Sequence, residues 1–403
     1  MKRLALTLLI ASLLGMAGAA AAGPAKSKAP ANALDVMTQN QYLGTDLAPV
    51  ITAPPDMLND RVVQALENVA ATLPTERLGR LAKLIADRSP HVVALNEAFV
   101  YSCQNMAPDT TPAFEGCGNQ RITGAFVDFL ATTEANLAGK YVTKARVQNF
   151  AVAGLPFEID GYWALLTVKD RDAIMVRSDV APMSAPVPLA LSPACRQSLE
   201  GCNFQAVPTV PTALGDITVE RGFTAVDLAV GGQVYRVFAT HLEQRQLVPG
   251  DDPSRVLQRL QAAELLQTAL LFPAAAGTKK LVVGDINSAP TDEPTFLPTP
   301  IGQLPPPYFI FTGSGFIDTW TLRPGAASGK GAPLVGFSCC QLEDLSNHKS
   351  VLYERIDMIF SLPTPTSVKN ARLLGEVVAD KTWPPGLGLW PSDHASVAAG
   401  LQY

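Results

Sequence analysis

The feature that most constrains the fold of this chain is a short apolar segment that recurs and stops abruptly at a polar residue. Residues 33–40, 91–97 and 281–287 show this pattern, and each segment has the length and β-branched content of a strand. Between such segments, residues 78–88 and 253–271 place apolar side chains at helical spacing. The alternation predicts an α/β fold in which two mixed sheets pack face to face and helices cover their outer faces.

Hairpins are mixed into this alternation. Gly231 and Gly232 separate two strand-like segments, residues 223–230 and 234–241, as in a tight hairpin turn. Further strands are predicted at residues 172–177, 355–360 and 395–401.

The N-terminal segment has the pattern of a secretory signal peptide rather than of folded structure. Lys2 and Arg3 precede an apolar run that is too short to span a bilayer, and small residues follow it up to residue 22. We therefore expect residues 1–22 to be a signal peptide and residues 23–33 to be a flexible tail. The mature protein is expected to be secreted or periplasmic.

The rest of the chain, residues 34–403, is long enough for one large α/β domain. Insertions are expected near residues 101–120, 181–220 and 291–350, the last two being rich in Pro, Gly, Ser and Thr. A separate small domain within residues 291–350 is the alternative.

The cysteine pattern fits an exported protein. The chain has six cysteines, an even number, which favours disulfides over metal binding outside the cytoplasm. Local pairing of Cys103 with Cys117 and of Cys195 with Cys202 is expected from their spacing. The adjacent pair at residues 339 and 340 forms either a bridge of its own or bonds to other cysteines.

Polar residues at the predicted strand ends are the candidate functional residues. Asp285 and Asn287 lie two apart and therefore face the same side of their strand. A simple turn would explain this pair alone. However, other strands also end or begin at polar or titratable groups, namely Asn40, Glu97, His241, Asp357 and the pair Asp393-His394. We expect these ends to converge on one cleft.

Such a set supports the hydrolysis of a phosphate ester. Carboxylate and amide oxygens suit a hard divalent cation, which would neutralise charge on a phosphoryl group. Histidines held by carboxylates can transfer protons and donate hydrogen bonds.

Seven motifs in order give the chain a resemblance to the endonuclease/exonuclease/phosphatase superfamily, which includes DNase I-like nucleases and bacterial sphingomyelinases. The motifs are MTQN (37–40), VVALNE (92–97), ATHL (239–242), VGDIN (283–287), GFIDTW (315–320), RIDMIF (355–360) and SDH (392–394). The resemblance covers residues 34–402 and implies a secreted bacterial member with a four-layer α/β sandwich. One departure is Asn96, where the superfamily has Gln before its metal-binding glutamate.

The resemblance also implies a role for each matched residue. Asn40, Glu97 and Asp393 would hold the metal, which is expected to be Mg²⁺, or else Mn²⁺ or Ca²⁺. Asp285 would orient or deprotonate the attacking water, and Asn287 would bind the phosphate.

The two histidines of the motifs complete the implied site. His241 would contact the phosphate and assist the leaving group, with Asp172 as its expected partner and Asp170 as the substitute. His394 would act as a base or a phosphate clamp, oriented by Asp357.

The substrate stays open between a nuclease reaction and a sphingomyelinase-like or phospholipase C-like reaction, with a generic phosphatase as a third candidate. The net charge of −5 and the lack of a basic stripe weaken the nuclease, because a polyanion needs basic groups or a metal. Residues 305–311 are apolar and aromatic, so they either contact a membrane surface or pack under the insertion. A catalytically lapsed binding or adhesion module is the alternative function, and a monomer is expected.

Overall fold

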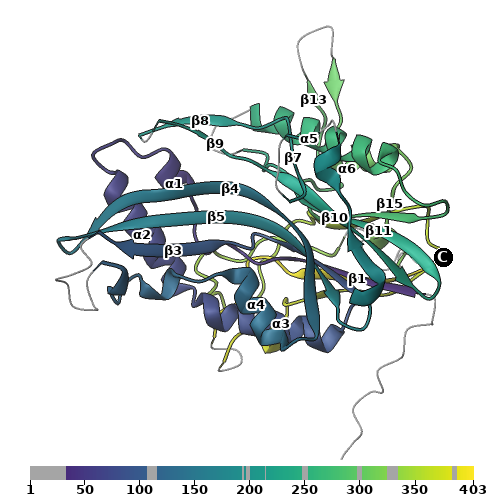
Figure 1. Ribbon diagram of the computed structural model, residues 1–403, viewed down its shortest axis with the longest axis horizontal. Helices are drawn as coiled ribbons and strands as arrows, with labels where there is room; N and C mark the ends of the chain where they lie inside the picture. The colour runs from purple at the N-terminus through teal and green to yellow at the C-terminus, as the bar shows by residue number, and fades with distance from the viewer. Residues whose placement is uncertain are drawn as a thin grey trace, which may run out of the picture.

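The computed structural model describes residues 33–106, 116–192, 195–196, 200–213, 215–246, 253–296, 302–324, 335–383 and 388–403. The predicted signal peptide and nearly all of the predicted tail lie outside these residues. Two seven-stranded mixed sheets form the centre of the molecule (Figure 1).

The first sheet is formed by both ends of the described chain. Its strand order is β17 (Ser367–Leu374), β18 (Ser396–Gln402), β1 (Ala33–Asn40), β2 (Val92–Asn96), β5 (Tyr162–Arg177) and β3 (Val100–Asn105), with β4 (Tyr141–Ile159) also paired to β5. Strands β1 and β2 are parallel, and the other pairs are antiparallel.

The second sheet is formed by the middle of the chain. Its strand order is β15 (Ile317–Asp318), β16 (Asp357–Leu362), β12 (Lys279–Asp285), β11 (Gln233–His241), β10 (Gly222–Val230) and β6 (Ser184–Pro186), with β7 (Cys202–Asn203) paired to β10. Strands β11 and β12 are parallel. Since β6 and β7 lie within residues 181–220, part of this expected surface excursion extends the sheet.

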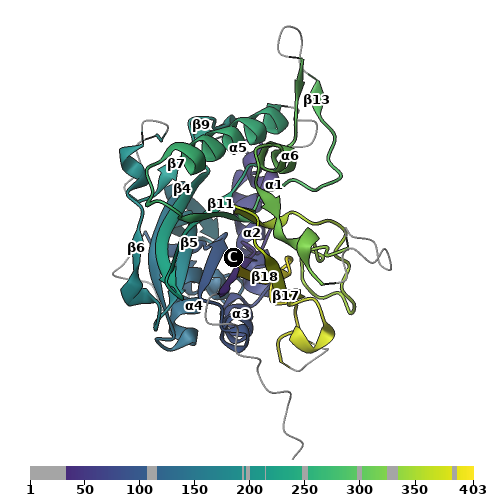
Figure 2. The same ribbon diagram turned by 90° about the vertical axis from the view of Figure 1, so that its right-hand side faces the viewer.

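Helices cover the outer face of each sheet (Figures 1 and 2). They are α1 (Ala48–Ile51), α2 (Leu58–Ala71), α3 (Pro74–Arg88), α4 (Phe129–Leu137), α5 (Pro253–Leu271) and α6 (Pro307–Gly313), and short 3₁₀ turns are η1 (Gly116–Gly118), η2 (Thr123–Ala125), η3 (Ala181–Met183), η4 (Leu189–Leu191), η5 (Thr319–Leu322) and η7 (Val378–Asp380). Two small hairpins complete the described elements, β8 (Thr209–Thr212) with β9 (Gly215–Thr218) and β13 (Thr295–Phe296) with β14 (Gln303–Leu304). Among these helices none has the length and apolarity to span a membrane.

The main core lies between the two sheets, as the alternation of side chains along each strand requires. Leu34 and Val36 of β1 face Val237 of β11 and Val283 of β12 in this layer. On the outer face of the second sheet, α5 buries Leu265 against the other side of the same strands. The arrangement confirms the predicted four-layer α/β sandwich.

Residues 305–311 pack inward for the most part. Tyr308 and Phe311 of α6 are buried, and Phe311 stacks on Phe360 of β16. Phe309 is exposed. Most of this segment therefore packs under the insertion. A membrane contact stays a prediction, because Phe309 leaves only a small aromatic surface exposed.

The cysteines pair as their spacing predicts. Disulfides join Cys103 to Cys117 and Cys195 to Cys202. The adjacent cysteines at 339 and 340 bond to each other, which decides between the two alternatives left open.

Candidate active site

Strand register places one row of titratable residues at the end of the second sheet. His241 ends β11, Asp285 ends β12, and these two residues are direct partners in the parallel pair. Asp285 is in turn the partner of Asp357, the first residue of the antiparallel strand β16. All three side chains are buried. The predicted convergence of these strand ends therefore follows from main-chain hydrogen bonding.

The first sheet supplies a second row at the same edge. Asn40 ends β1 and is the register partner of Asn96, the last residue of β2. Glu97 follows with φ of 52°, a left-handed conformation that non-glycine residues rarely adopt. The SDH motif precedes β18, which is antiparallel to β1, so Asp393 and His394 lie beside the end of β1.

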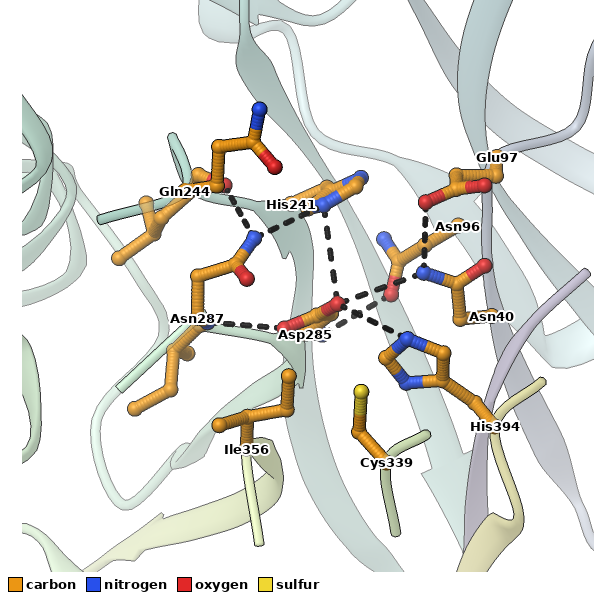
Figure 3. A network of polar contacts seen from close by, with 12 residues as sticks. Asn40, Asn96, Glu97, His241, Gln244, Asp285, Asn287, Cys339, Ile356 and His394 are labelled. Atoms are coloured by element: carbon orange, nitrogen blue, oxygen red, sulfur yellow. Dashed lines mark hydrogen bonds and ion pairs between the residues drawn. The ribbon is translucent and has the colours of Figure 1, made fainter. Parts of the chain in front are cut away.

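Asp285 is the centre of the polar network that joins the two rows (Figure 3). Its Oδ2 accepts from Asn40 Nδ2 at 3.3 Å, and it lies 3.6 Å from His241 Nε2 and 3.8 Å from His394 Nε2. Its Oδ1 accepts from the backbone N–H of Asn287 at 2.8 Å. Burial and the Asp357 charge raise the pKa of Asp285 to about 6, which makes it a base at neutral pH.

His394 is held as a cation. Its Nδ1 lies 2.8 Å from Asp357 Oδ2, so its Nε2 faces Asp285. Burial lowers the pKa of His394, but the carboxylates of Asp357 and Asp393 outweigh burial and hold it well above its usual range. This charge disfavours the expected role as a base and makes Nε2 a donor, either of a hydrogen bond to a phosphoryl oxygen or of a proton.

His241 has the opposite environment. Its Nδ1 lies 2.9 Å from Nη1 of Arg221, and because a guanidinium can only donate, Nδ1 accepts and Nε2 carries the hydrogen. Burial and the Arg221 charge hold the pKa of His241 well below its usual range. His241 is therefore a neutral ring. Its Nε2 lies 3.1 Å from Nδ2 of Asn287, which is also a donor, and 3.6 Å from Oδ2 of Asp285, so the Nε2 hydrogen is available to the carboxylate or to a substrate oxygen.

The expected pairing of His241 with Asp172 is wrong. Asp172 accepts instead from Asn96 Nδ2 at 2.8 Å and Asn149 Nδ2 at 3.0 Å. The substitute, Asp170, does not contact the histidine either, and it lies 3.6 Å from Nη1 of Arg221. An arginine thus stands between the histidine and the carboxylates of β5.

Glu97 and Asp393 form an acidic pair that suits a hard cation. Burial and the Asp393 charge raise the pKa of Glu97 to about 7, and burial also raises the pKa of Asp393. Buried carboxylates that are costly to ionise are donors that a divalent cation would stabilise. The predicted ligands therefore fit a metal ion by charge and by donor type.

Asn40, the third predicted ligand, has another contact in this structure. Its Nδ2 donates to Glu97 Oε1 at 2.9 Å, while its Oδ1 accepts from the backbone N–H of Tyr42 at 2.9 Å. The amide therefore links the acidic pair to Asp285.

A cleft of about 630 Å³ opens over this network. Its lining includes Glu97, His241, Asp285, Asn287, Asp393 and His394. Asp172, Asp357 and Asn40 do not line it, so they act behind the cleft surface.

Sequence reasoning missed three contributors. Arg221 directly precedes β10 and belongs to no motif. The sequence marks Asn96 only as a departure from the family pattern, but its Oδ1 accepts from the backbone N–H of Asp285 and its Nδ2 donates to the Thr240 carbonyl at 2.9 Å. Ser338 Oγ accepts from the backbone N–H of Asp357 at 3.1 Å. Only Asn96 carried a signal, its place directly before Glu97.

Two mixed sheets with a cleft of carboxylates, histidines and amides at their strand ends define a DNase I-like α/β sandwich. The chain belongs to the endonuclease/exonuclease/phosphatase family, whose model matches residues 65–394. Membership places it among hydrolases of phosphate esters.

Solved structures give distant matches that each cover 92% of this chain. An endonuclease/exonuclease/phosphatase from Beutenbergia cavernae is 18% identical, with 72% of that chain covered and a TM-score of 0.46. A mannosyl-6-phosphatase from Bacteroides thetaiotaomicron (14%, 100% covered, TM-score 0.49) and a truncated TDP2 from Caenorhabditis elegans (14%, 98% covered, TM-score 0.43) also match. A comparison with curated protein sequences gives no significant match.

Proposed function

We propose that this protein is an exported, divalent-metal-dependent hydrolase of phosphodiesters. The observation that carries the proposal is the position of Asp285, a carboxylate of raised pKa that lies between a neutral and a positively charged histidine. The signal-peptide pattern at residues 1–22 supports export.

The side chains divide the reaction between them. Asp285 takes a proton from the attacking water while the water oxygen forms a new bond to phosphorus. His394 donates a proton from Nε2 to the ester oxygen as its bond to phosphorus breaks. Neutral His241 and the amide of Asn287 donate hydrogen bonds to the phosphoryl oxygens. The family resemblance implies that His241 assists the leaving group, whereas the charges of the two rings favour His394 as its proton donor.

Glu97 and Asp393, with Asn40 beside them, would hold the cation. When bound, a divalent ion would neutralise charge on the phosphate. Asp357 acts behind the cleft by fixing the ring of His394.

Hydrolysis of bis(p-nitrophenyl) phosphate over a Mg²⁺ titration tests the proposal. Glu97→Gln should raise the half-saturating Mg²⁺ concentration at least tenfold, because it removes a charged ligand. His394→Ala should lower kcat by two orders of magnitude or more. His348→Ala is the matched control, because His348 lies on an exposed loop outside the cleft.

Two results would contradict the proposal. One is equal turnover with EDTA and with Mg²⁺. The other is no turnover of any phosphate ester with Mg²⁺, Mn²⁺ or Ca²⁺, which would favour the binding-module alternative.

A further inference from the structure

An apolar groove adjoins the catalytic cleft on the side of α1. Residues of helices α1 and α2, of the long β4–β5 hairpin and of the β8–β9 hairpin line it, and Figure 1 shows where these elements lie. Its lining is apolar except for two threonines and a tyrosine: Thr45, Leu47, Val50, Ile51, Leu58, Val62, Ala65, Leu66, Val69, Tyr101, Phe150, Val152, Leu155, Leu166, Val168, Thr212 and Ile217. We call this the apolar groove.

The apolar groove borders the cleft. Both are lined by Thr45, Leu47, Ile51 and Phe150. An apolar group attached to a phosphate in the cleft therefore has the groove directly beside it.

The backbone of Leu43 ties the groove to the acidic pair. Its N–H donates to Glu97 Oε2 at 2.7 Å, and its carbonyl accepts from the hydroxyl of Tyr101 at 3.0 Å. Tyr101 is part of the groove wall, and Leu43 lines the cleft. A single residue, Leu43, thus joins the groove wall to a predicted metal ligand through hydrogen bonds.

The size of the groove selects a slim occupant. Its volume is about 80 Å³, whereas one water takes a share of roughly 30 Å³ in the liquid. Part of an unbranched alkyl chain fits this space, and a nucleobase does not. Leu47, Ile51, Phe150 and Ile217 are each left partly exposed, so an alkyl chain would remove apolar surface from water.

The charge of the cleft also disfavours a polyanion. Seven carboxylate residues line it: Asp46, Glu97, Asp170, Asp285, Glu343, Glu354 and Asp393. Its two arginines, Arg221 and Arg245, are already close to carboxylates. Among the described lining residues there is no basic track of the kind that a nucleic acid backbone needs.

We propose that the apolar groove binds the alkyl chain of the substrate, so that the preferred substrate is a lipid phosphate ester. This inference rests on the proposed phosphodiesterase activity and narrows its substrate class. The chain would lie against α1 and α2 while the phosphate reaches Asp285.

A series of alkyl p-nitrophenyl phosphates (methyl, butyl and octyl) tests the inference at concentrations below micelle formation, with Mg²⁺. We expect kcat/KM to rise about fourfold for each methylene that becomes buried. The rise should level off once the groove is filled. Thymidine 5′-p-nitrophenyl phosphate serves as the nucleotide arm and should be a poorer substrate than the octyl ester.

Two variants locate the effect in the groove. Ala65→Trp, on α2, should fill the groove and lower the octyl-to-methyl ratio of kcat/KM at least tenfold. Ile217→Ser, at the edge on β9, should lower the same ratio less. Ala135→Trp is the matched control at an exposed position of α4, outside the cleft and the groove, and should keep the wild-type ratio. Because the measure is a ratio within one variant, a partly unfolded preparation does not imitate the effect.

The outcomes separate this inference from the proposed function. Equal kcat/KM for all chain lengths would overturn the inference, and so would faster hydrolysis of the thymidine ester than of the octyl ester. Neither result would contradict the proposed phosphodiesterase activity. An unchanged ratio in Ala65→Trp would also overturn it. No hydrolysis of any ester in the series would instead refute the proposed function.

Discussion

His241 and His394 face the same carboxylate with different charges. A carboxylate neighbour keeps the proton on His394, and a guanidinium neighbour removes it from His241. One neutral donor and one cationic donor thus lie on either side of Asp285. This asymmetry assigns separate roles to two residues of the same type.

Arg221 should control the protonation of His241. Arg221→Met removes the neighbouring positive charge, so the pKa of His241 should rise, and kcat should fall by one to two orders of magnitude as the other tautomer becomes accessible. Histidine-ring NMR over pH 4 to 9 would measure this change.

The control variants separate charge from packing. Arg221→Lys keeps the charge and should keep the pKa of His241 low. Arg196→Met, at an ion pair with Glu220 outside the cleft, should change neither the pKa nor kcat. An unchanged His241 titration in Arg221→Met would refute the assignment.

Asp172 should make stability depend on pH. Burial and the Asp170 charge raise its pKa to about 8 in the folded protein, above the ordinary value of 3.8. The folded state therefore holds a proton that the unfolded state releases, and this stabilisation is complete below about pH 4 and is lost as pH rises through 8.

Thermal melting of Asp172→Asn would test this linkage. The wild-type Tm should fall between pH 5 and pH 9, and the variant should lose a few degrees less over that interval, because asparagine does not titrate. Parallel curves for the two proteins would count against a raised pKa at Asp172.

At the scale of elements, the sequence predicts where strands end, but it does not predict the side-chain contacts between neighbouring strands. Helix α5 has the predicted bounds, and β1 ends at Asn40 as expected, because apolar periodicity and abrupt polar stops are local signals. Arg221 meets His241 across the β10–β11 pair, and no spacing along the chain encodes that contact. The predicted pairing of Asp172 with His241 is wrong because Asp172 accepts from the side chain of Asn96 instead.

Gly284 fixes the close approach of β12 to β11. Its φ is 140°, and a Cβ atom there would overlap the carbonyl oxygen of Thr240. Gly284→Ala should destabilise the protein by roughly 1–3 kcal/mol and should lower activity, because Asp285 follows directly.

Urea denaturation would measure the loss. Gly313→Ala is the matched control at the end of α6, where the added Cβ would meet no heavy atom within 4 Å beyond its chain neighbours and its own helix backbone. It should leave stability unchanged or raise it by about 0.4–1 kcal/mol. Equal stabilities for the two variants would show that β11 and β12 leave room for a Cβ atom at Gly284.

At the scale of the whole molecule, export and disulfide formation should appear together. The protein recovered from the medium or the periplasm should begin near Gly23 and carry three disulfides. Intact mass measured before and after reduction would show both properties. A mass that retains residues 1–22, or no gain of hydrogen on reduction, would contradict the export proposal.

The register of the first sheet places a strand from late in the chain beside one from its start. Strand β18 pairs with β1, and the SDH motif just before β18 supplies two residues of the site. A nascent chain on the ribosome therefore cannot assemble the site before residues 393–402 have emerged. While the chain is still being synthesised, it therefore cannot cleave a phosphate ester through this site.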